Sequence, residues 1–341
     1  MQKINLLGFT LDQLKFEFLK NGLSVLDAKR VFPWIHAKLA ASFDVMTDVP
    51  LETRKILEYT YSLARPRCLT LQKSSDRTCK ALLEMSDGNL IETALIPEER
   101  RTTVCISTQI GCAMGCKFCH TGTQNFVRNL TSSEIISQIF FWKTEMTITN
   151  VVFMGMGEPL LNFKNLSSVL ELLLNEKTHN FSRNKITVST SGIVDDAIES
   201  LAKFGVKLAI SLHAHTDEKR SFLMPINKKY NIKTLLEAAR IYRKNSNTDY
   251  VTFEYLLLKD VNDANSDALV LARLLKSAPC KVNLIAFNGW PGAELTGSPE
   301  GRQNEFARIL ASNGIRVTVR KSKGKDILAA CGQLKGTSNL L

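Results

Sequence analysis

One short segment governs the whole chain, Ile110-Gly111-Cys112-Ala113-Met114-Gly115-Cys116-Lys117-Phe118-Cys119-His120. It contains three cysteines, Cys112, Cys116 and Cys119, in the spacing C-x3-C-x2-C. Three thiolates on one loop can bind three irons of a [4Fe–4S] cube, because soft sulfur ligands suit iron–sulfur clusters. The fourth iron would then lack a protein ligand and could bind a small molecule.

The same three cysteines would also be compatible with two different roles. One is to bind a structural zinc ion, with His120 as its fourth ligand, and the other is to act as unrelated buried thiols. Zinc sites usually show paired C-x2-C units, and this segment has only one. The spacing therefore favours the cluster, and it is similar to the signature of the radical S-adenosylmethionine (SAM) superfamily, in which the open iron chelates SAM.

The composition is that of an ordinary soluble globular protein. The chain has 341 residues, of which 44% are hydrophobic and 23% charged, enough for one large domain and a small one. We expect a cytoplasmic protein without a membrane contact, because it has neither an apolar run of ~18–20 residues nor an apolar signal segment after Met1. A net charge of +11 favours a nucleic-acid partner, although a solvated basic surface would also explain it.

Residues 1–64 have helical periodicity, and we expect them to form an accessory RNA-binding domain or a simple cap on the core. One helix is predicted to begin at Thr10, a second to span residues 28–39, and a third to begin at Pro50. The side chains expected on the buried faces of the first two helices are Leu14, Phe16, Phe18, Leu19, Val31, Trp34, Ile35 and Leu39.

Residues 65–97 are predicted to form a β-meander that links this domain to the core, with strands at 69–72, 80–85 and 89–96. From residue 98 to 341 strands alternate with helices, the first of which begins with the capping box Thr131-x-x-Glu134. The pattern predicts an α/β fold, a partial (β/α) barrel with its active site at the carboxyl ends of the strands. The expected core strands are 103–108, 150–154, 185–190, 207–212, 250–257, 281–286 and 315–320.

Polar residues follow several of these strands. Gly155-Met156-Gly157-Glu158-Pro159 comes after one strand, and Leu160 excludes a dinucleotide fingerprint, which requires glycine there. Gly157 would let a ligand approach the backbone, and Glu158 could accept a hydrogen bond from an ammonium group such as that of SAM. The other expected SAM-binding residues are Ser189, Ser211, Leu212, His213 and Asn288. Trp290 could stack on a base or pack in the core.

Two further cysteines differ from the buried, unreactive kind that we expect at Cys68, Cys79 and Cys280. Cys105 lies in the first core strand, seven residues before Cys112, and Cys331 lies in a glycine-flanked segment after the last strand. That segment can fold over the mouth of the barrel. The basic residues before it, Arg316, Arg320, Lys321, Lys323 and Lys325, would lower the pKa of the Cys331 thiol.

Taken together, these motifs resemble the RlmN/Cfr family of radical SAM RNA methyltransferases. The matching motifs run over nearly the whole chain and include Ile4-Asn5-Leu6-Leu7-Gly8, Asn89-Leu90-Ile91-Glu92-Thr93 and Ala330-Cys331-Gly332-Gln333-Leu334. The first of these, together with Glu158-Pro159, is more similar to the RlmN branch than to Cfr. One departure is His120 directly after the third cluster cysteine.

The resemblance implies a mechanism with two SAM molecules per turnover. Cys331 takes a methyl group from one SAM, and the cluster cleaves the second to a radical that activates this methyl group for addition to C2 of an adenine. Cys105 then releases the covalent protein–RNA adduct through a disulfide with Cys331, and either Cys105 or Glu92 accepts the proton. Metal-binding Cys112, Cys116 and Cys119 complete the implied site.

The implied substrates are an adenosine in the peptidyl-transferase region of 23S rRNA and the adenosine 3′ of the anticodon in some tRNAs. An electron donor such as flavodoxin is implied, and a monomer is expected. Three alternatives remain: methylation at adenine C8, as in Cfr; a radical SAM enzyme that modifies a peptide; and a zinc-stabilised RNA-binding module.

Overall fold

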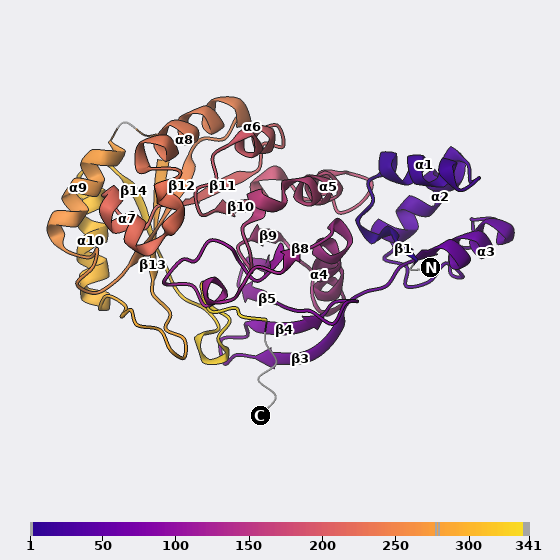
Figure 1. Ribbon diagram of the computed structural model, residues 1–341, viewed down its shortest axis with the longest axis horizontal. Helices are drawn as coiled ribbons and strands as arrows, with labels where there is room; N and C mark the ends of the chain where they lie inside the picture. Colours follow the sequence, from indigo (N-terminus) through magenta and orange to yellow (C-terminus); the bar gives the residue numbers. More distant parts are fainter. Residues whose placement is uncertain (1–2, 277, 279, 337–341) are drawn as a thin grey trace.

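A single curved sheet carries the core of the protein (Figure 1). The computed structural model describes residues 3–276, 278 and 280–336, so residues 337–341 of the expected core lie outside the description. The sheet has ten strands in the order β14-β13-β12-β11-β10-β9-β6-β5-β4-β3. Their bounds are β3 Arg67–Lys73, β4 Cys79–Glu84, β5 Leu90–Glu98, β6 Arg101–Cys105, β9 Asn150–Phe153, β10 Ile186–Thr190, β11 Lys207–Ser211, β12 Val251–Leu257, β13 Cys280–Ala286 and β14 Arg316–Arg320.

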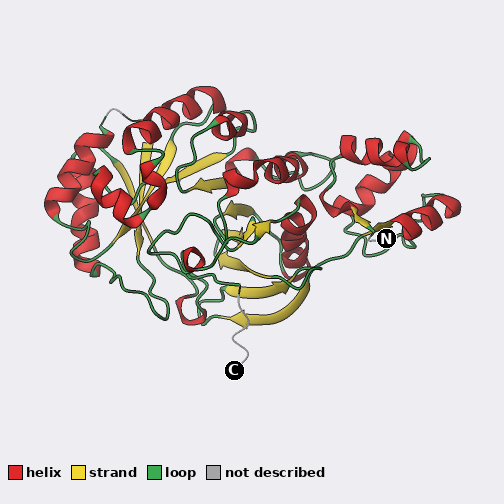
Figure 2. Cartoon of the chain, in the orientation of Figure 1, coloured by secondary structure: helices red, strands yellow, loops and turns green. Residues whose placement is uncertain are grey.

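In this sheet β6 and then β9 to β14 pair in parallel and in chain order, which confirms the predicted α/β fold. β6 and β14 are not neighbours, so this part of the sheet is an open, partial barrel. Figure 2 shows helices along the outer side of the curved sheet. These helices are α4 Ser132–Glu145, α5 Phe163–Leu174, α6 Asp196–Ala202, α7 Asp217–Leu223, α8 Ile232–Ser246, α9 Asn265–Leu275 and α10 Glu300–Ser312.

The β-meander is part of this sheet and not a separate connector. Its strands β3, β4 and β5 are antiparallel, and β5 continues the ladder onto β6, where Ala94 pairs with Cys105. Within the meander Leu82 pairs with Glu92. The meander therefore places Glu92 in the same sheet as Cys105.

The N-terminal helices are α1 Leu11–Lys20, α2 Val25–His36 and α3 Leu51–Thr60. Leu14 and Phe18 of α1 are fully buried, as expected, but Phe16 and Leu19 are 63% and 58% exposed, so their predicted burial is wrong. Residues four apart share a helix face, whereas Phe16 lies two positions from each buried residue and therefore on the opposite side. One stripe of α1 is enough to cover this small cluster.

A short parallel pair fastens these helices into one unit, because β1 Ile4–Asn5 pairs with β2 Tyr61–Ser62. The unit docks on α4, where the Ser133 hydroxyl accepts from the Gly8 amide at 3.0 Å and donates to the Asn5 carbonyl at 3.0 Å. The predicted capping box at the start of α4 is present between Thr131 and Glu134. Within the described ranges, no helix is long and apolar enough to cross a membrane.

Candidate active site

A short two-stranded ladder brackets the cysteine loop at its two ends. β7 Gln109–Ile110 pairs with β8 Arg128–Asn129 outside the ten-stranded sheet, so the segment between them begins and ends at this ladder. Gly111 begins this excursion with a φ of +70°, and a Cβ there would lie 2.0 Å from the Asn125 carbonyl oxygen. Only glycine fits this combination of backbone angle and close approach.

The three cysteines of the loop line one cavity of about 150 Å³. The other walls come from the carboxyl ends of the parallel strands, where the active site of a (β/α) barrel belongs. The strand-end residues in the wall include Met154, Gly157, Glu158, Ser189, Ser191, Ser211, His213, Glu254, Leu256, Ile285 and Phe287. Cys331 and Gly332 close the cavity from the C-terminal side.

The donor set fits a [4Fe–4S] cluster. Burial raises the pKa of all three thiols, to about 12 for Cys112, so their thiolate forms need a compensating cation such as iron. Among the described residues no three His, Cys, Asp or Glu side chains converge on a single metal ion. A cube does not require such convergence, because each cysteine binds a different iron.

His120 is engaged in packing and not placed as a fourth zinc ligand. Its Nδ1 lies 3.1 Å from the Gln333 carbonyl oxygen, and its ring stacks on Trp290 with centroids 4.7 Å apart. Trp290 in turn donates from Nε1 to the Phe118 carbonyl at 3.3 Å. The tryptophan therefore packs against the cysteine loop, which favours the packing role over stacking on a base.

The C-terminal segment 324–335, here the tail, folds over the cavity mouth as the sequence predicted. The amide of His120 donates to the Gly332 carbonyl at 2.7 Å, and the Thr121 hydroxyl donates to the Leu334 carbonyl at 2.5 Å. On the other side, the amide of Lys335 donates to Glu92 Oε2 at 2.8 Å. The tail is thus bonded both to the cysteine loop and to the meander.

Gly157 and Glu158 are closely packed where β9 ends, and Glu158 bonds to Ser191 at the end of the neighbouring strand β10. Gly157 has a φ of +94°, and a Cβ there would lie 2.4 Å from Gln109 Cβ. The Glu158 carboxylate accepts from the Ser191 amide at 2.6 Å and from the Ser191 hydroxyl at 2.7 Å. Burial raises the pKa of Glu158, although these hydrogen bonds oppose the rise. A carboxylate has lone pairs for more partners, so Glu158 can still accept a hydrogen bond from a ligand ammonium.

The remaining predicted SAM-binding residues divide into two groups. Ser189, Ser211 and His213 line the cavity, whereas Leu212 is fully buried in the hydrophobic core and Asn288 lies beside the tail. Asn288 Nδ2 donates to the Cys331 carbonyl at 3.4 Å, and its buried Oδ1 has no partner in the described part of the chain. That oxygen is available to a donor on a ligand.

His213 is held in one neutral form. Its φ is +54°, and its Nδ1 accepts from the Leu256 amide at 3.0 Å, so the ring proton lies on Nε2. Burial, with a smaller contribution from the nearby Arg220, lowers the pKa of His213 to about 3. His213 can therefore donate a hydrogen bond to a ligand but does not carry a charge at neutral pH.

Cys105 lies behind the cavity wall at the end of β6, and Cys331 lies in the wall itself. The two thiols are close enough that Cys331 contributes to the raised pKa of Cys105, after the larger effect of burial. All eight cysteines are free, so the expected disulfide between Cys105 and Cys331 is not supported by this structure. Cys105 and Cys331 nevertheless belong to one buried group of interacting titratable side chains.

Sequence reasoning missed one member of that group, Glu254, and it named Arg320 only as one of five basic residues near Cys331. The Arg320 side chain bonds to the Cys331 thiol and lowers its pKa, but burial outweighs this effect and the pKa of Cys331 is raised. The prediction that basic residues lower that pKa overall is therefore wrong. Glu254 is buried in β12 and lines the cavity. Its signal in the sequence was a single acid within the apolar run of β12.

Glu92 is placed away from the cavity wall. Its Oε1 pairs with Lys80 Nζ at 2.9 Å, and both side chains are only 9% exposed. Its Oε2 accepts from the Lys335 amide in the tail. Glu92 therefore joins the meander to the tail that carries Cys331.

Comparison with known proteins identifies the family. Residues 106–272 match the radical SAM superfamily, and residues 4–62 match the ribosomal RNA large subunit methyltransferase N-terminal domain. The dual-specificity RNA methyltransferase RlmN of Francisella tularensis subsp. mediasiatica is 42% identical over 98% of this chain and 93% of that protein. RlmN of Paracoccus denitrificans is 41% identical over 98% of this chain and 90% of that protein.

A solved structure agrees with these relatives. The crystal structure of a radical SAM methyltransferase from Sphaerobacter thermophilus superposes with a TM-score of 0.91 at 41% identity and covers 98% of this chain and 100% of that one. The identity extends through the helical unit, the meander and the core. The chain therefore belongs to the RlmN family of radical SAM RNA methyltransferases.

Proposed function

We propose that this protein methylates C2 of an adenosine in the peptidyl-transferase region of 23S rRNA and of the adenosine directly 3′ of the anticodon in tRNAs. The names of the RlmN relatives support two classes of RNA substrate. One observation supports the chemistry above all others: the hydrogen bond from His120 to Gly332 brings the tail against the cysteine loop. Cys331 consequently lines the same cavity as the three cluster cysteines.

The cavity residues have two tasks in this proposal. Cys112, Cys116 and Cys119 hold the [4Fe–4S] cluster, and Gly157, Glu158, Ser189, Ser211 and His213 contact SAM. Cluster and SAM together supply reductive cleavage chemistry, which is needed because an adenine C2–H carbon is not nucleophilic. Two SAM molecules are consumed for each methyl group transferred, one as the methyl donor and one as the molecule that is cleaved.

Cys331 acts first as a nucleophile. Its thiolate attacks the methyl carbon of SAM, so a sulfur–carbon bond forms on Cys331 as the sulfonium–carbon bond of SAM breaks. Arg320 favours this thiolate because its guanidinium bonds to the Cys331 sulfur. Once a hydrogen atom has been removed from this methyl group, which is the chemistry that the cluster and the second SAM would supply, the same carbon would bond to adenine C2. Return of one electron to the cluster and loss of the C2 proton would leave Cys331 joined covalently to the RNA.

Cys105 resolves that adduct. Its thiolate attacks the Cys331 sulfur, a disulfide forms, the sulfur–carbon bond breaks, and the freed carbon takes up a proton to become the methyl group. We assign the removal of the C2 proton to Cys105 before Glu92, because Cys105 interacts electrostatically with Cys331, whereas Glu92 is bonded to Lys80 and Lys335. Asn288 lies beside the Cys331 carbonyl, and its unpartnered Oδ1 would contact an adenine.

Nucleoside mass spectrometry of rRNA and tRNA from cells with and without the gene tests the proposal. We expect 2-methyladenosine to disappear from both RNAs without the gene and to return with the wild-type protein but not with Cys331→Ala. Cys105→Ala should leave RNA attached to the protein. 8-Methyladenosine would instead identify a Cfr-type activity, and unchanged nucleosides without an adduct would favour a peptide substrate.

The cofactor can be tested separately. Anaerobically reconstituted protein should be brown and contain about four irons per chain. A colourless, zinc-loaded protein would contradict the assignment of Cys112, Cys116 and Cys119. The proposal also places the enzyme in the cytoplasm with its RNAs, as a monomer that takes electrons from a donor such as flavodoxin.

A further inference from the structure

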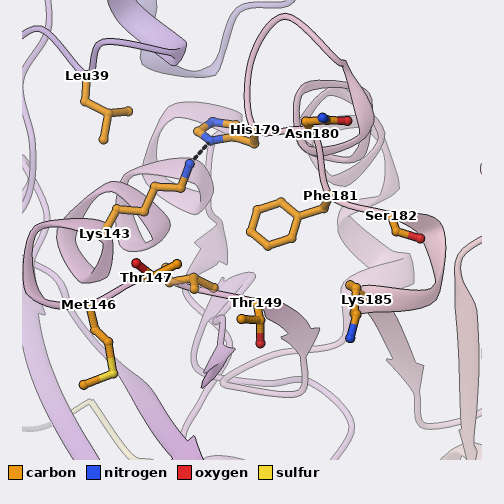
Figure 3. A pocket seen from close by; sticks show the side chains of 11 residues that line it. Leu39, Lys143, Met146, Thr147, Thr149, His179, Asn180, Phe181, Ser182 and Lys185 are labelled. Atoms are coloured by element: carbon orange, nitrogen blue, oxygen red, sulfur yellow. Dashed lines mark hydrogen bonds between the residues drawn. The ribbon is translucent and has the colours of Figure 1, made fainter. Parts of the chain in front are cut away.

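A second cavity of about 450 Å³ lies at the other end of the strands (Figure 3). Residues 146–149 of its wall lead into β9, and residues 181–185 lead into β10. These are the amino ends of the strands, whereas the cysteine-lined cavity lies at their carboxyl ends. Leu39, which follows α2, completes the wall, so the cavity lies where the N-terminal helical unit meets the core. Its size is within the range of roughly 300–1,000 Å³ that is usual for ligand pockets.

The central feature of this cavity is an ammonium group without a counter-charge. Lys143 Nζ donates to His179 Nδ1 at 2.7 Å and lies 5.9 Å from the centre of the Phe181 ring (Figure 3). No carboxylate in the described ranges pairs with Lys143, and burial lowers its pKa. A partly buried charge without a partner is unfavourable, and a bound anion would remove that penalty. The ammonium has three donors, of which His179 uses one.

His179 adds another donor to the same wall. Because Lys143 donates to Nδ1, the proton of the neutral imidazole lies on Nε2. This Nε2 is buried and has no hydrogen-bond partner among the described residues. The hydroxyls of Thr147 and Ser182 also line the cavity, and its wall contains no Asp or Glu. The cavity is therefore rich in donors and positive charge.

The positive charge continues from Lys185 in the cavity wall along a basic strip, which consists of Arg183, Lys185, Lys207 and Lys281. Lys207 begins β11, and its pKa is lowered by burial and then by repulsion from Lys185 and Lys281. Arg183 reaches the turn before β11, where its Nη1 would lie 3.0 Å from a Cβ on Gly205. Within the described part of the protein no ion pair joins these four side chains to an acid. Several uncompensated cations in a row match a polyanion better than a single small ion.

We propose that the cavity around Lys143 and the basic strip bind backbone phosphates of the RNA substrate, away from the base that reacts. The identity of the ligand as RNA rests on the proposed function. The five residues of β10 span roughly 16 Å at about 3.3 Å per residue, and they separate Lys185 in the wall of this cavity from Ser191 in the wall of the other. A folded RNA easily covers that distance. Phosphate contacts of this kind position a nucleic acid without selecting its sequence.

RNA binding by a matched pair of double variants tests this proposal. Lys143→Gln with Lys185→Gln removes two charges from the cavity, and Lys233→Gln with Lys244→Gln removes two exposed charges from the outer helix α8. With the holoenzyme and a tRNA transcript, the cavity variant should bind about tenfold more weakly and lose about one unit of salt dependence per phosphate contact. The α8 variant should bind within twofold of wild type.

Two readouts distinguish failure of this proposal from failure of the proposed function. The first readout is methylation of Cys331 by SAM without RNA, measured by mass spectrometry, and it should be the same in the cavity variant as in the wild type. If neither protein becomes methylated, the result counts against the proposed function and not against the phosphate site. Equal RNA affinity and salt dependence in both double variants would overturn the phosphate site. Should the double variant fold poorly, Lys185→Glu keeps the test available, because Lys185 is exposed.

The source of the phosphate needs its own experiment. Inorganic phosphate is added to the wild-type protein and to the cavity variant, and the melting temperature is measured. If phosphate stabilises only the wild type while RNA binding is the same in both, the cavity binds free phosphate and the assignment to RNA is wrong. RNA that competes with phosphate for the wild-type protein supports it.

Discussion

The imidazole of His120 lies parallel to the indole of Trp290, with ring centroids 4.7 Å apart and the planes inclined by 7°. His120 directly follows the last cluster cysteine, and Trp290 lies in the loop after β13. Because His120 also bonds to Gly332 and Gln333, this stack joins the cysteine loop to the tail that carries Cys331. The two halves of the proposed active site are thus joined by this aromatic contact together with the hydrogen bonds of the tail.

Replacing Trp290 by alanine should loosen that contact. We expect a loss of about 1–2 kcal/mol in stability, because an aromatic pair contributes about 0.5–1.5 kcal/mol beyond its buried area. Alkylation of Cys331 by iodoacetamide should become faster, as measured by peptide mass spectrometry. Tyr59→Ala is the control, since Tyr59 is 86% exposed. If the Cys331 labelling rate is the same in both variants, the stack does not hold the tail.

Replacing Glu92 by glutamine separates its structural role from proton transfer. The change leaves Lys80 buried without its partner, which should lower the free energy of unfolding by about 3 kcal/mol. Glu84→Gln breaks an ion pair with Arg67, whose side chain is 72% exposed, and should change stability by less than about 1 kcal/mol. Urea unfolding measures both values. Equal stability of the two variants would show that the Lys80 pair contributes nothing.

Gly157→Ala should be poorly tolerated. The new Cβ would lie 2.4 Å from Gln109 Cβ at a φ of +94°, so either the backbone or Gln109 must move. We expect destabilisation of about 2 kcal/mol or more and weaker SAM binding by calorimetry. Gly301→Ala is the matched control, because nothing lies within 4 Å of that position and alanine favours helix α10. A Gly157→Ala protein as stable as Gly301→Ala would contradict the close packing described.

Acid should destabilise the protein partly through His36. Burial lowers the pKa of His36 to about 3 in the folded protein, against 6.5 when unfolded. Between these values the unfolded chain binds more protons, so stability falls as the pH drops below 6.5, by about 2 kcal/mol at pH 5. His36→Gln can keep the hydrogen bond to the Phe9 carbonyl and should flatten this dependence. Urea midpoints at pH 7 and pH 5 measure it, and the same pH dependence in both proteins would exclude His36 as a source.

Arg320→Met should make Cys331 less reactive. The guanidinium lowers the pKa of the Cys331 thiol, so its removal should reduce the thiolate fraction and slow alkylation at pH 8 by about tenfold. Arg316→Met at the other end of β14 is exposed and should have no such effect. Alkylation rates of Cys331 over a range of pH separate a shifted pKa from a merely loosened tail. A pH profile identical to that of wild type would exclude Arg320 as the activating group.

Much of the fold and the grouping of three cysteines on one loop could be predicted from the sequence, because both depend on local patterns. The ligand spacing of Cys112, Cys116 and Cys119 lies within one loop, and the period of apolar residues located the ends of the parallel strands to within three residues. The glycine before Glu158 and the glycines around Cys331 were also informative, because glycine affects the conformation of the backbone at its own position.

Contacts between distant segments were decided only by the tertiary structure. The pair Glu92–Lys80, the bond between Arg320 and Cys331, and the exposure of Phe16 all depend on which surfaces the folded chain brings together. The pKa of Cys331 shows the same limit, because five basic residues nearby in sequence suggested a lowered value, while burial in the folded protein raises it. Sequence alone thus determined which groups are available for the chemistry, and the packing determined their partners, their charge and their access to the cavity.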